Sequence, residues 1–430
     1  MPFESVPMPP KRIAVIGGGI SGMAAAWMLA PQHHVTLIEA APRLGGHART
    51  VMAGRNGDQP VDTGFIVFNH ANYPNLTAMF RELEVPTAPA SMSFGASFDN
   101  GACEYALASL DTLFAARRNL ADPRFLRMVR DILRFNAKAE SVATDPEMSI
   151  GGLMDRLGMG SWFRERYIAP FSGAIWSTPK SKIMEFPARA MVDFFRNHAL
   201  LSNGGQHQWH TVKGGSIEYV TRLERSLRAR GVEIRLSTPM AGVRRNPLGA
   251  ELRAEGGDWE AFDEVIFATH SDTTLSLLSD ASETERLALS AVGYQDNHAV
   301  LHRDASIMPK RRKVWSSWTY TEHAPGDRDR ISLSYWMNSL QPIPMEDEMF
   351  VTLNGSRPIR DELIYDEHTF RHPVYDLAAF AAQDVLRVLN GHNATWFCGA
   401  WMKNGFHEDG FASAVDVVQK MGAQALPAAA

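Results

Sequence analysis

The stretch that decides the fold is KRIAVIGGGISGMAAAWMLAPQHHVTLIEA, residues 11–40. It predicts a short apolar strand, a glycine-rich turn, a helix of small and apolar residues, and a second strand that ends on the carboxylate of Glu39. Gly17, Gly19 and Gly22 have the spacing G-x-G-x-x-G, which permits a tight turn, a close approach of the backbone to a pyrophosphate, and close packing of helix on strand. The N-terminus of such a helix has unpaired N–H groups and a partial positive charge, which favour a phosphate. The stretch therefore predicts a dinucleotide-binding site.

The acid at the end of the second strand narrows the choice of dinucleotide. Glu39 follows the last glycine of the motif by about the 20 residues expected for a carboxylate that binds ribose. Such a carboxylate accepts hydrogen bonds from both ribose hydroxyls and repels a 2′-phosphate, so FAD and NAD fit better than NADP. A glycine-rich turn without a ligand is the alternative interpretation, but the strand, helix and acid are all in register.

The composition is that of an ordinary soluble globular chain. Of its 430 residues, 45% are hydrophobic and 21% are charged, which allows two domains and an enclosed pocket. The net charge of -5 argues against a general nucleic-acid-binding protein, which would be basic. The two cysteines, Cys103 and Cys398, suit a reducing compartment. Because no signal-peptide core and no apolar run of about 20 residues is found, we expect a cytoplasmic protein, with any membrane contact peripheral to the inner face of the membrane.

Further motifs lie on both sides of the chain. The run RLGGHART, residues 43–50, continues directly from the second strand, and VDTGF, residues 61–65, follows shortly after it. Near the other end, WFCGA at 396–400 predicts a short apolar strand. GFHEDGFASA at 405–414 then opens a helix whose first residues are acidic, as the helix dipole favours.

These segments resemble the flavoprotein superfamily that includes monoamine oxidases, protoporphyrinogen oxidase and phytoene desaturases, whose motif R-x-G-G-R-x-x-T the run 43–50 follows. His47 stands where the family usually has Arg, so the charge contact would either be weaker or be supplied by Arg49. The resemblance implies FAD as the cofactor. It also implies an α/β fold, with a Rossmann-type, GR2-like FAD-binding domain and an interleaved α+β substrate domain.

The resemblance also implies how the chain is divided. Residues 1–85, 205–290 and 390–430 would form the FAD-binding domain, and residues 86–204 and 291–389 would form the substrate domain. The chain would therefore leave the FAD-binding domain and return to it twice.

The cofactor-binding residues that the resemblance implies come from both ends of the chain. In the family, the run 43–50 wraps the pyrophosphate and ribityl chain, and backbone near Val243 contacts the adenine. The C-terminal strand end and helix N-terminus lie against the flavin ring, where a helix dipole would stabilise the negative charge of the reduced flavin. The full set is Gly17, Gly19, Ile20, Ser21, Gly22, Glu39, Ala40, Arg43, Gly45, Gly46, His47, Thr63, Gly64, Phe65, Val243, Gly399, Gly410, Phe411 and Ala412.

Three residues are candidates for catalysis by the same resemblance. Amine oxidases of the family flank the reactive carbon with two aromatic side chains and place a lysine near flavin N5. Phe406 stands where one of those aromatic residues, usually Tyr, would be, and His298 takes the place of the lysine. A Phe and a titratable His suit C–C dehydrogenation or isomerisation better than simple amine oxidation. His407 is the third candidate, with a capping role as its alternative, and an ordinary strand histidine is the alternative for His298.

No metal site is expected, because the neighbouring histidines at 33–34 and at 207 and 210 lack carboxylate or cysteine partners at ligand spacing.

Residues 124–134 predict a helix with an apolar stripe and a basic stripe. The apolar stripe is Phe125, Met128, Val129 and Ile132. The basic stripe is Arg124, Arg127, Arg130 and Arg134. A solvated face is one interpretation of the basic stripe. The other is docking on anionic lipid, since about 1 kcal/mol per basic residue is available near such a surface.

A more specific resemblance is to a group of bacterial FAD-dependent proteins with the segments DTGFIVFN, NYPNL, WHTVKGGS and GFHEDGFASA. That group is associated with the synthesis of cyclopropane and methylated fatty acids, which implies a fatty-acyl lipid as the hydrophobic substrate. We therefore expect an FAD-dependent oxidoreductase of the desaturase or oxidase type that passes a hydride to flavin N5. The alternatives are a flavin amine oxidase that forms an imine and hydrogen peroxide, and a flavin-binding redox sensor or assembly factor without turnover.

Overall fold

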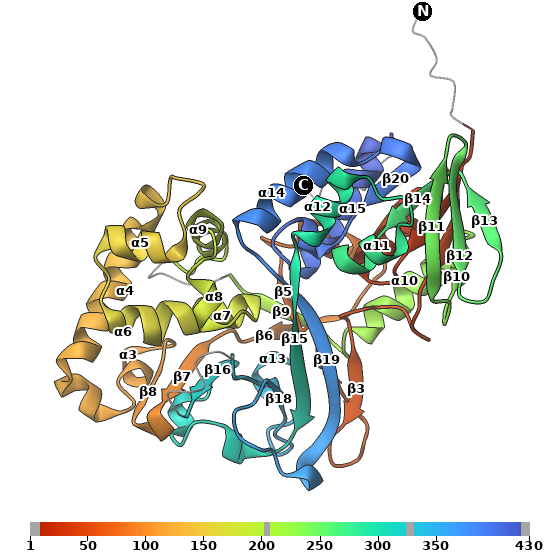
Figure 1. Cartoon of the computed structure of the whole chain (residues 1–430). Coiled ribbons are helices and arrows are strands. Elements are labelled where there is room, and N and C mark those ends of the chain that lie inside the picture. The colour runs from red at the N-terminus through yellow and green to blue at the C-terminus, as the bar shows by residue number, and fades with distance from the viewer. Residues whose placement is uncertain (1–8, 202–206, 324–330, 423–430) are drawn as a thin grey trace, which may run out of the picture.

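The computed structural model describes residues 9–201, 207–323 and 331–422. The molecule has two lobes (Figure 1). The lobe at the right of Figure 1 contains a parallel sheet, and the lobe at the left contains helices packed on a mixed sheet.

A five-stranded parallel sheet forms the centre of the first lobe. Its strands lie in the order β10 (Glu233–Arg235), β2 (His34–Ile38), β1 (Arg12–Ile16), β14 (Glu264–Phe267) and β20 (Thr395–Phe397). In both β1 and β2 every residue except the first is buried, as expected for a sheet covered on both faces. Strands from the beginning, the middle and the end of the chain are thus neighbours, and the segments that follow them meet at one edge of the sheet.

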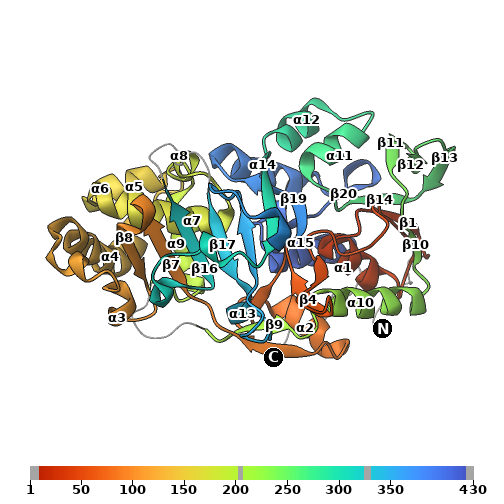
Figure 2. The ribbon, with the colours of Figure 1, turned by 90° about the horizontal axis from the view of Figure 1, so that it is seen from below.

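Three helices cover one face of this sheet. Helix α1 (Ile20–Leu29) is buried at all ten positions. It packs against α10 (Ile217–Ala229) and α15 (His407–Lys420), which lie beside it in Figure 2. The glycine and alanine residues of α1 permit this close packing, because small side chains let helix backbones approach one another.

The other face of the sheet is covered by a small antiparallel sheet and three helices. The strands are β11 (Met240–Asn246), β12 (Gly249–Ala254) and β13 (Trp259–Phe262), and the helices are α11 (Ser271–Leu277), α12 (Glu283–Ser290) and α14 (Leu377–Leu389). Helix α14 lies within the stretch 291–389, which is predicted to belong to the substrate domain, and it buries Ala379, Ala382 and Leu386 in the apolar cluster that contains residues of the parallel sheet.

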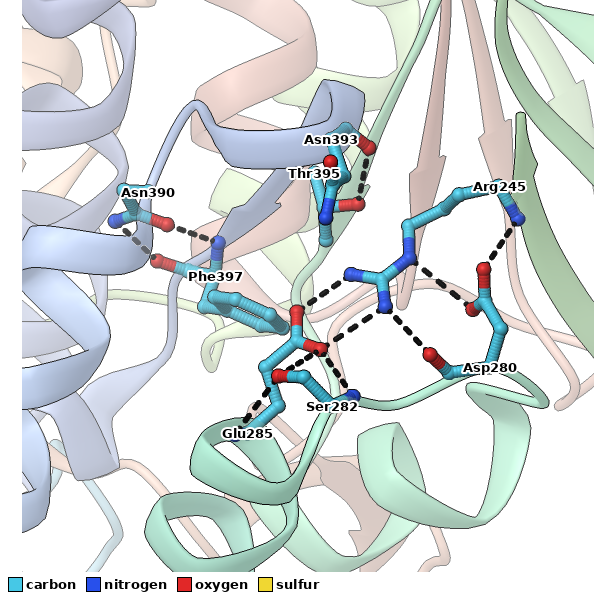
Figure 3. Close-up of polar contacts among 8 residues, drawn as sticks. All are labelled: Arg245, Asp280, Ser282, Glu285, Asn390, Asn393, Thr395 and Phe397. Carbon is cyan, nitrogen blue, oxygen red and sulfur yellow. Dashed lines mark hydrogen bonds and ion pairs between the residues drawn. The ribbon is translucent and has the colours of Figure 1, made fainter. Parts of the chain in front are cut away.

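Buried polar contacts join these layers. Arg245 of β11 donates to Glu285 at the start of α12, with 2.9 Å between Nη2 and Oε2, and to Asp280, with 3.1 Å between Nε and Oδ1 (Figure 3). At the end of α14, Asn390 accepts a hydrogen bond from the Phe397 N–H and donates one to the Phe397 carbonyl, which fixes β20 (Figure 3). Such paired buried groups avoid the cost of unsatisfied polar atoms.

The second lobe is built on a seven-stranded mixed sheet. The strands lie in the order β19 (Ile364–Val374), β15 (Gly293–His302), β18 (Phe350–Leu353), β17 (Leu333–Trp336), β16 (Trp318–Glu322), β7 (Phe94–Phe98) and β8 (Cys103–Ala106). The long pair β15 and β19 is antiparallel and forms the edge nearest the parallel sheet (Figure 1).

Helices pack on this mixed sheet and form the outer layer. They are α3 (Leu110–Leu113), α4 (Pro123–Val142), α5 (Ile150–Leu157), α6 (Ser161–Phe163), α7 (Ala169–Trp176), α8 (Lys180–Ile183) and α9 (Ala188–Asn197). Their apolar side chains share one large cluster with the sheet, rich in Phe, Met and Leu.

Short elements connect the lobes. They are β3 (Thr50–Ala53), β4 (Gln59–Asp62), β5 (Val67–Asn69), α2 (Pro74–Glu82), β6 (Thr87–Ala90), β9 (Trp209–Val212) and α13 (Met337–Leu340). None of the helices in the described ranges has the length and apolarity that a transmembrane segment requires. The arrangement as a whole is the α/β fold that the sequence predicts.

Candidate functional site

The three motif glycines of the turn after β1 have different surroundings. Gly17 has φ +110°, and a Cβ added there would lie 2.7 Å from the Ala268 carbonyl oxygen. A Cβ on Gly22 would lie 1.8 Å from the Gly17 carbonyl oxygen, so this glycine permits the contact of helix and turn. A Cβ on Gly19 would meet no atom within 4 Å. Gly19 therefore borders open space, as expected of the glycine whose backbone a pyrophosphate approaches.

Two helix N-termini meet beside this open space. Helix α1 begins at Ile20 without any side chain capping its N–H groups. A Cβ added to Gly410, in the first turn of α15, would lie 2.9 Å from both Ile20 Cγ2 and Ser21 Oγ. The predicted residues Ile20, Ser21 and Gly410 are thus in contact. The first turns of the two helices therefore lie together, and the uncapped N–H groups and the dipole of α1 favour a bound anion such as the pyrophosphate of FAD.

Glu39 lies where a ribose would be held. Its Oε2 accepts a hydrogen bond from the Gly18 N–H at 2.5 Å, and its Oε1 accepts one from the Ala41 N–H at 2.8 Å. The carboxylate therefore stands at the edge of the glycine turn, at the end of β2. Its backbone carbonyl accepts from the Thr238 N–H, which brings the chain before β11 to this edge.

The structure places Val243 away from this edge. The Val243 side chain is fully buried in an apolar cluster, and its carbonyl accepts a hydrogen bond from the Ser279 N–H at 2.9 Å. Thr238 lies next to the Glu39 backbone, five residues earlier in the chain. Thr238, and not Val243, is thus bonded to the Glu39 backbone, and the adenine contact near Val243 stays a prediction.

The loop after Glu39 covers the glycine turn. The Arg43 guanidinium donates hydrogen bonds to the carbonyls of Leu44, Gly46 and Ala48. These bonds keep the loop compact. The Gly45 N–H donates to the Gly18 carbonyl at 2.9 Å. A Cβ on Gly46 would lie 3.1 Å from Gly19 Cα, so Gly46 faces the same open space.

His47 and Arg49 have different surroundings. Arg49 forms a two-pronged ion pair with Asp366 of β19, with 2.6 Å between Nη1 and Oδ2 and 3.0 Å between Nη2 and Oδ1. It also donates to the Thr63 hydroxyl. Arg49 is therefore already paired with Asp366, and its role as a substitute for the charge that His47 lacks stays a prediction.

Several histidines gather around His47. The ring of His47 has its centroid 5.5 Å from that of His372, 5.8 Å from that of His270 and 5.3 Å from that of Phe370. Burial lowers the pKa of His47, lowers the pKa of His270 to about 4 and lowers that of His372 to about 3. These histidines are neutral at pH 7. They form a lining without charge, which suits an uncharged aromatic ring.

The segment after β4 joins this lining to α15. A Cβ on Gly64 would lie 2.0 Å from the His47 carbonyl oxygen, and the Phe65 N–H donates to the same oxygen at 3.0 Å. The ring of Phe65 stacks on that of His407, with centroids 3.9 Å apart. His407 Nε2 lies 2.6 Å from the Tyr219 hydroxyl. Burial, and next the neighbouring His47, lower the pKa of His407 to about 3.

The C-terminal segment is held by its own contacts. The Gly399 N–H donates to the Ser413 hydroxyl at 2.8 Å, which ties the end of β20 to α15. Phe411 is fully buried in the apolar cluster around α1. Its neighbour Ala412, the sixth residue of α15, is half-buried.

His298 is turned away from this region. It lies on β15 opposite Thr369, is exposed, and has its Nε2 3.7 Å from the Glu367 carboxylate. Side chains alternate between the two faces of a strand. The face that carries Phe370 and His372 toward His47 therefore also carries Asn297, whose Nδ2 lies 3.0 Å from His372 Nδ1. The structure therefore directs Asn297, and not His298, at this lining, and the expectation that His298 takes the lysine position stays a prediction.

Phe406 lines a cavity between the two lobes. The cavity has a volume of about 450 Å³. Its apolar lining consists of Tyr73, Pro146, Pro187, Ala190, Phe194, Leu377, Phe380 and Phe406. Its polar lining consists of Asn72, Arg189, Asp193, Asn197, His198, Asn404, Glu408 and Asp409. The Phe406 ring stacks on that of Phe194, with centroids 4.7 Å apart.

The two acids at the head of α15 are buried beside this cavity. Glu408 accepts hydrogen bonds from the backbone N–H groups of Asn75 and Leu76 and so caps helix α2. Asp409 accepts from the Phe406 N–H and caps its own helix. Burial raises the pKa of Glu408 to about 7 and that of Asp409 to about 6. Both groups can therefore exchange a proton near neutral pH.

Some residues of this site were not predicted. Asn297, His270, His372 and Tyr219 have no sequence motif of their own. One signal was available in the stretch EHTFRHPVY, residues 367–375, where His368, Phe370 and His372 alternate as one face of a strand. Among the described residues, no group of three or more His, Cys, Asp and Glu side chains is arranged to hold a metal ion.

The site as described fits FAD. Gly19 leaves open space, two helix N-termini face it, and Glu39 stands at the ribose end. A neutral aromatic and histidine lining then leads toward the cavity at Phe406. The individual contacts to the cofactor remain predictions.

Known proteins of related fold include several flavoenzymes. The putative protoporphyrinogen oxidase from Exiguobacterium sp. 255-15 has 18% identity and a TM-score of 0.72, over 96% of this chain and 99% of that one. The CLA-producing fatty acid isomerase from P. acnes has 14% identity and a TM-score of 0.68, over 95% and 98%. Cyclohexylamine oxidase from Brevibacterium oxydans IH-35A has 14% identity and a TM-score of 0.66, over 96% and 100%. At these identities the likeness shows the fold alone.

Curated relatives match over short segments. The L-amino-acid oxidase of Sistrurus catenatus edwardsii is 50% identical over 42 residues, which are 10% of this chain and 8% of that protein. The carotenoid phi-ring synthase of Chlorobaculum tepidum is 44% identical over 73 residues, which are 16% of this chain and 11% of that protein.

A family model gives the broadest match. The model described as flavin containing amine oxidoreductase matches residues 20–302, well over half of the chain. The predictions of FAD as cofactor and of an FAD-dependent oxidoreductase are thereby confirmed. The chain belongs to the family of flavin containing amine oxidoreductases.

Proposed function

We propose that this flavoenzyme dehydrogenates a hydrophobic substrate, a fatty-acyl chain, held in the cavity beside Phe406. The observation that carries the proposal is the apolar wall of that cavity, formed by Phe194, Phe380, Phe406 and Leu377. A volume of about 450 Å³ is within the range of small-molecule sites. When bound, FAD supplies a hydride acceptor at N5.

The protein's own part in this reaction is to position the substrate and exclude water. The stacked rings of Phe194 and Phe406 form a rigid wall that an alkyl chain can lie against. Arg189, 60% exposed, lines the same cavity 3.9 Å from the Asp193 carboxylate, and it would exchange that partner for the carboxylate of a fatty acid. Asp409, whose pKa burial raises to about 6, can accept a proton at neutral pH.

One observation favours an amine oxidase as the second candidate. Asp193, Glu408 and Asp409 line the same cavity as the aromatic rings. Carboxylates and aromatic faces together attract an ammonium group. An amine would be oxidised to an imine, and the reoxidation of the flavin by dioxygen would form hydrogen peroxide.

Anaerobic mixing separates the two candidates. The purified FAD-loaded protein is mixed with unsaturated and saturated fatty acids, and separately with alkyl and aryl amines, while the visible absorbance of the flavin is followed. Bleaching by fatty acids but not by amines supports the proposal. Bleaching by amines only, with peroxide formed on admission of air, refutes it in favour of the second candidate. Absence of bleaching by either class refutes both.

A pair of variants tests the position of the substrate. Arg189→Gln should raise KM for a free fatty acid about tenfold and leave KM for the corresponding methyl ester unchanged, because only the acid presents a carboxylate. Arg225→Gln, an exposed arginine on α10 far from the cavity, is the matched control. Equal changes for the acid and the ester would contradict the assignment of Arg189.

A further inference from the structure

Helix α4 forms the outer edge of the second lobe. In Figures 1 and 2 it lies at the left margin, at the end of the molecule opposite the parallel sheet. Asp122 caps its N-terminus by accepting from the Arg124 N–H at 2.9 Å. Phe125, Met128 and Phe135 are fully buried against the lobe. Apolar packing therefore fixes the inward face of α4, and the side chains of the opposite face are exposed in the described structure.

The outward face of α4 combines leucines with cations. Leu126 is 44% exposed and Leu133 is 53% exposed, and they lie seven residues apart on one side of the helix. We call the following residues the α4 outer face: Leu126, Arg127, Arg130, Leu133, Arg134 and Lys138, all of them exposed. Large exposed apolar side chains within a basic helix face are typical of helices that lie in a membrane interface.

Two acids of α4 lie near these cations: Asp131, and the exposed Glu140, which pairs with Arg196 of α9. Arg127 and Arg130 share one carboxylate, that of Asp131, at 3.7 Å and 3.4 Å. Asp131 is 1% exposed and also accepts from the Gly160 N–H, so it lies beneath the face. Within the described ranges, neither Arg134 nor Lys138 has an ion pair. A chain with a net charge of -5 therefore carries a local positive surface on one helix.

The same kind of surface continues past the helix N-terminus. Leu120 is 51% exposed, and Arg118 next to it lines a cavity together with Arg124. Arg124 itself is turned away from the α4 outer face, because it pairs with Asp122 and lies over the ring of Trp162. The basic stripe expected from the sequence is thus split, and Arg124 belongs to the supporting structure.

The α4 outer face also leads toward the substrate cavity. Pro146, four residues after the end of α4, lines the cavity of about 450 Å³. Glu140 of α4 pairs with Arg196 of α9, and α9 contributes Arg189 and Phe194 to the cavity lining. The helix and the cavity therefore belong to one layer of the lobe.

We propose that the α4 outer face docks on an anionic lipid bilayer, with its arginines at the level of the lipid phosphates and Leu126 and Leu133 in the boundary of the acyl chains. Charge decides against a second copy of the chain, since a symmetric contact would place the same cations opposite each other. The leucines argue against a merely solvated face, because no described part of the chain covers their exposed apolar surface. The inference goes beyond the proposed function, because it concerns binding and not turnover.

Sedimentation with vesicles tests the proposal on the full FAD-loaded chain. Vesicles of phosphatidylcholine with phosphatidylglycerol are compared with vesicles of phosphatidylcholine alone. We expect the protein to pellet with the anionic vesicles at low salt and to be released at high salt. Arg127→Gln with Arg130→Gln and Arg134→Gln should lower the partition coefficient by about a hundredfold, since each basic residue contributes about fivefold near such a surface.

Two further variants make the result specific. Leu126→Gln with Leu133→Gln keeps every charge and should lower binding at least tenfold, which a purely electrostatic attraction would not show. Arg225→Gln with Arg228→Gln and Arg286→Gln removes the same charge from exposed positions of the other lobe and should leave binding unchanged.

Three outcomes would overturn the proposal. They are absence of binding by the wild type to anionic vesicles, equal losses in the α4 and control triple variants, and a change of solution mass on Leu126→Gln and Leu133→Gln. The last result would mark the face as a contact between copies of the chain. Light scattering measures the mass on the same samples, and flavin absorbance confirms that each variant is folded and loaded.

Discussion

The Tyr219 hydroxyl lies 2.6 Å from Nε2 of His407, and this contact joins helix α10 to the first turn of α15. The two residues are far apart in the sequence, yet both side chains are directed at the same lining of neutral rings. Burial raises the pKa of Tyr219 well above its usual value, and burial lowers that of His407 to about 3. The pair is therefore uncharged through the whole neutral range.

A double-mutant cycle should detect this contact. Tyr219→Phe leaves a buried imidazole nitrogen without its partner, and we expect a loss of about 1 to 3 kcal/mol in the free energy of unfolding. His407→Phe keeps the stacking on Phe65 but removes the hydrogen bond. Urea unfolding of both single variants and the double variant should show a coupling of at least about 0.5 kcal/mol. Strictly additive effects would mean that the two side chains do not interact.

Two glycine substitutions should have different effects. Gly19→Ala places a methyl group in open space, so the apoprotein should keep its Tm, while its Kd for FAD should rise at least about tenfold because the pyrophosphate needs that space. Gly22→Ala places a methyl group 1.8 Å from the Gly17 carbonyl oxygen and should unfold the nucleotide-binding lobe. Flavin fluorescence titration and thermal melts measure both. A Gly19→Ala protein with unchanged FAD affinity would contradict the location of the pyrophosphate.

Substitutions of two neighbouring residues on β15 should also have different effects on stability and on the flavin spectrum. Asn297→Ala removes a fully buried side chain that bonds to His372 and should cost about 1 to 3 kcal/mol and alter the flavin absorbance spectrum. His298→Ala changes an exposed side chain and should alter stability by less than about 0.5 kcal/mol and leave the spectrum unchanged. The opposite order of effects would restore His298 as the residue that faces the cofactor.

The buried histidines should make the apoprotein sensitive to acid. Burial lowers the pKa of His372 to about 3, whereas an unfolded histidine has a pKa of about 6.5. Below pH 6.5 the unfolded chain binds a proton that the folded chain does not, so stability is lost as the pH falls from 6.5 toward 3. His372→Gln removes this loss, so the variant should be destabilised less at pH 5 than at pH 8.

Buried acids act in the opposite direction over part of this range. Burial raises the pKa of Asp62 to about 6 and that of Glu408 to about 7. These groups retain protons in the fold, so their contribution to stability decreases as the pH rises from about 4 toward 7. The comparison of His372→Gln with the wild type at each pH cancels them. Equal destabilisation at both pH values would show that His372 titrates normally.

The sequence was sufficient for the parts of the site that form locally. The glycine turn and Glu39 lie within one strand, turn, helix and strand unit, and each glycine is required by a contact inside that unit or next to it. The strand end and helix start of the C-terminal motif could also be predicted from the sequence, because Gly399 and Gly410 lie beside them. Local geometry leaves little freedom there.

The sequence was not sufficient to predict which side chains of a strand face the site, or which distant segments of the chain meet there. Whether Asn297 or His298 faces the site depends on the strand register, and a shift of one residue reverses every side chain. The neutral lining joins His47, His270, His372 and His407, which come from four separate segments. Only the pairing of β15 with β19 and the packing of α15 on α1 bring them together. The helix α14 was likewise assigned by its place in the chain and not by its packing.

Because Gly410 lies against Ser21, the order in which the chain is synthesised determines when it can hold the cofactor. The glycine turn leaves the ribosome early, but the helix that completes its open side is among the last described segments to be translated. A nascent chain can therefore form the first strand, turn and helix long before it can hold the cofactor firmly. Binding of FAD then stabilises only chains in which both segments have met. In a cell, retention of the flavin would act as a check that the chain has been made at least as far as α15 and has folded, and chains that stop short of α15 would stay exposed to proteolysis.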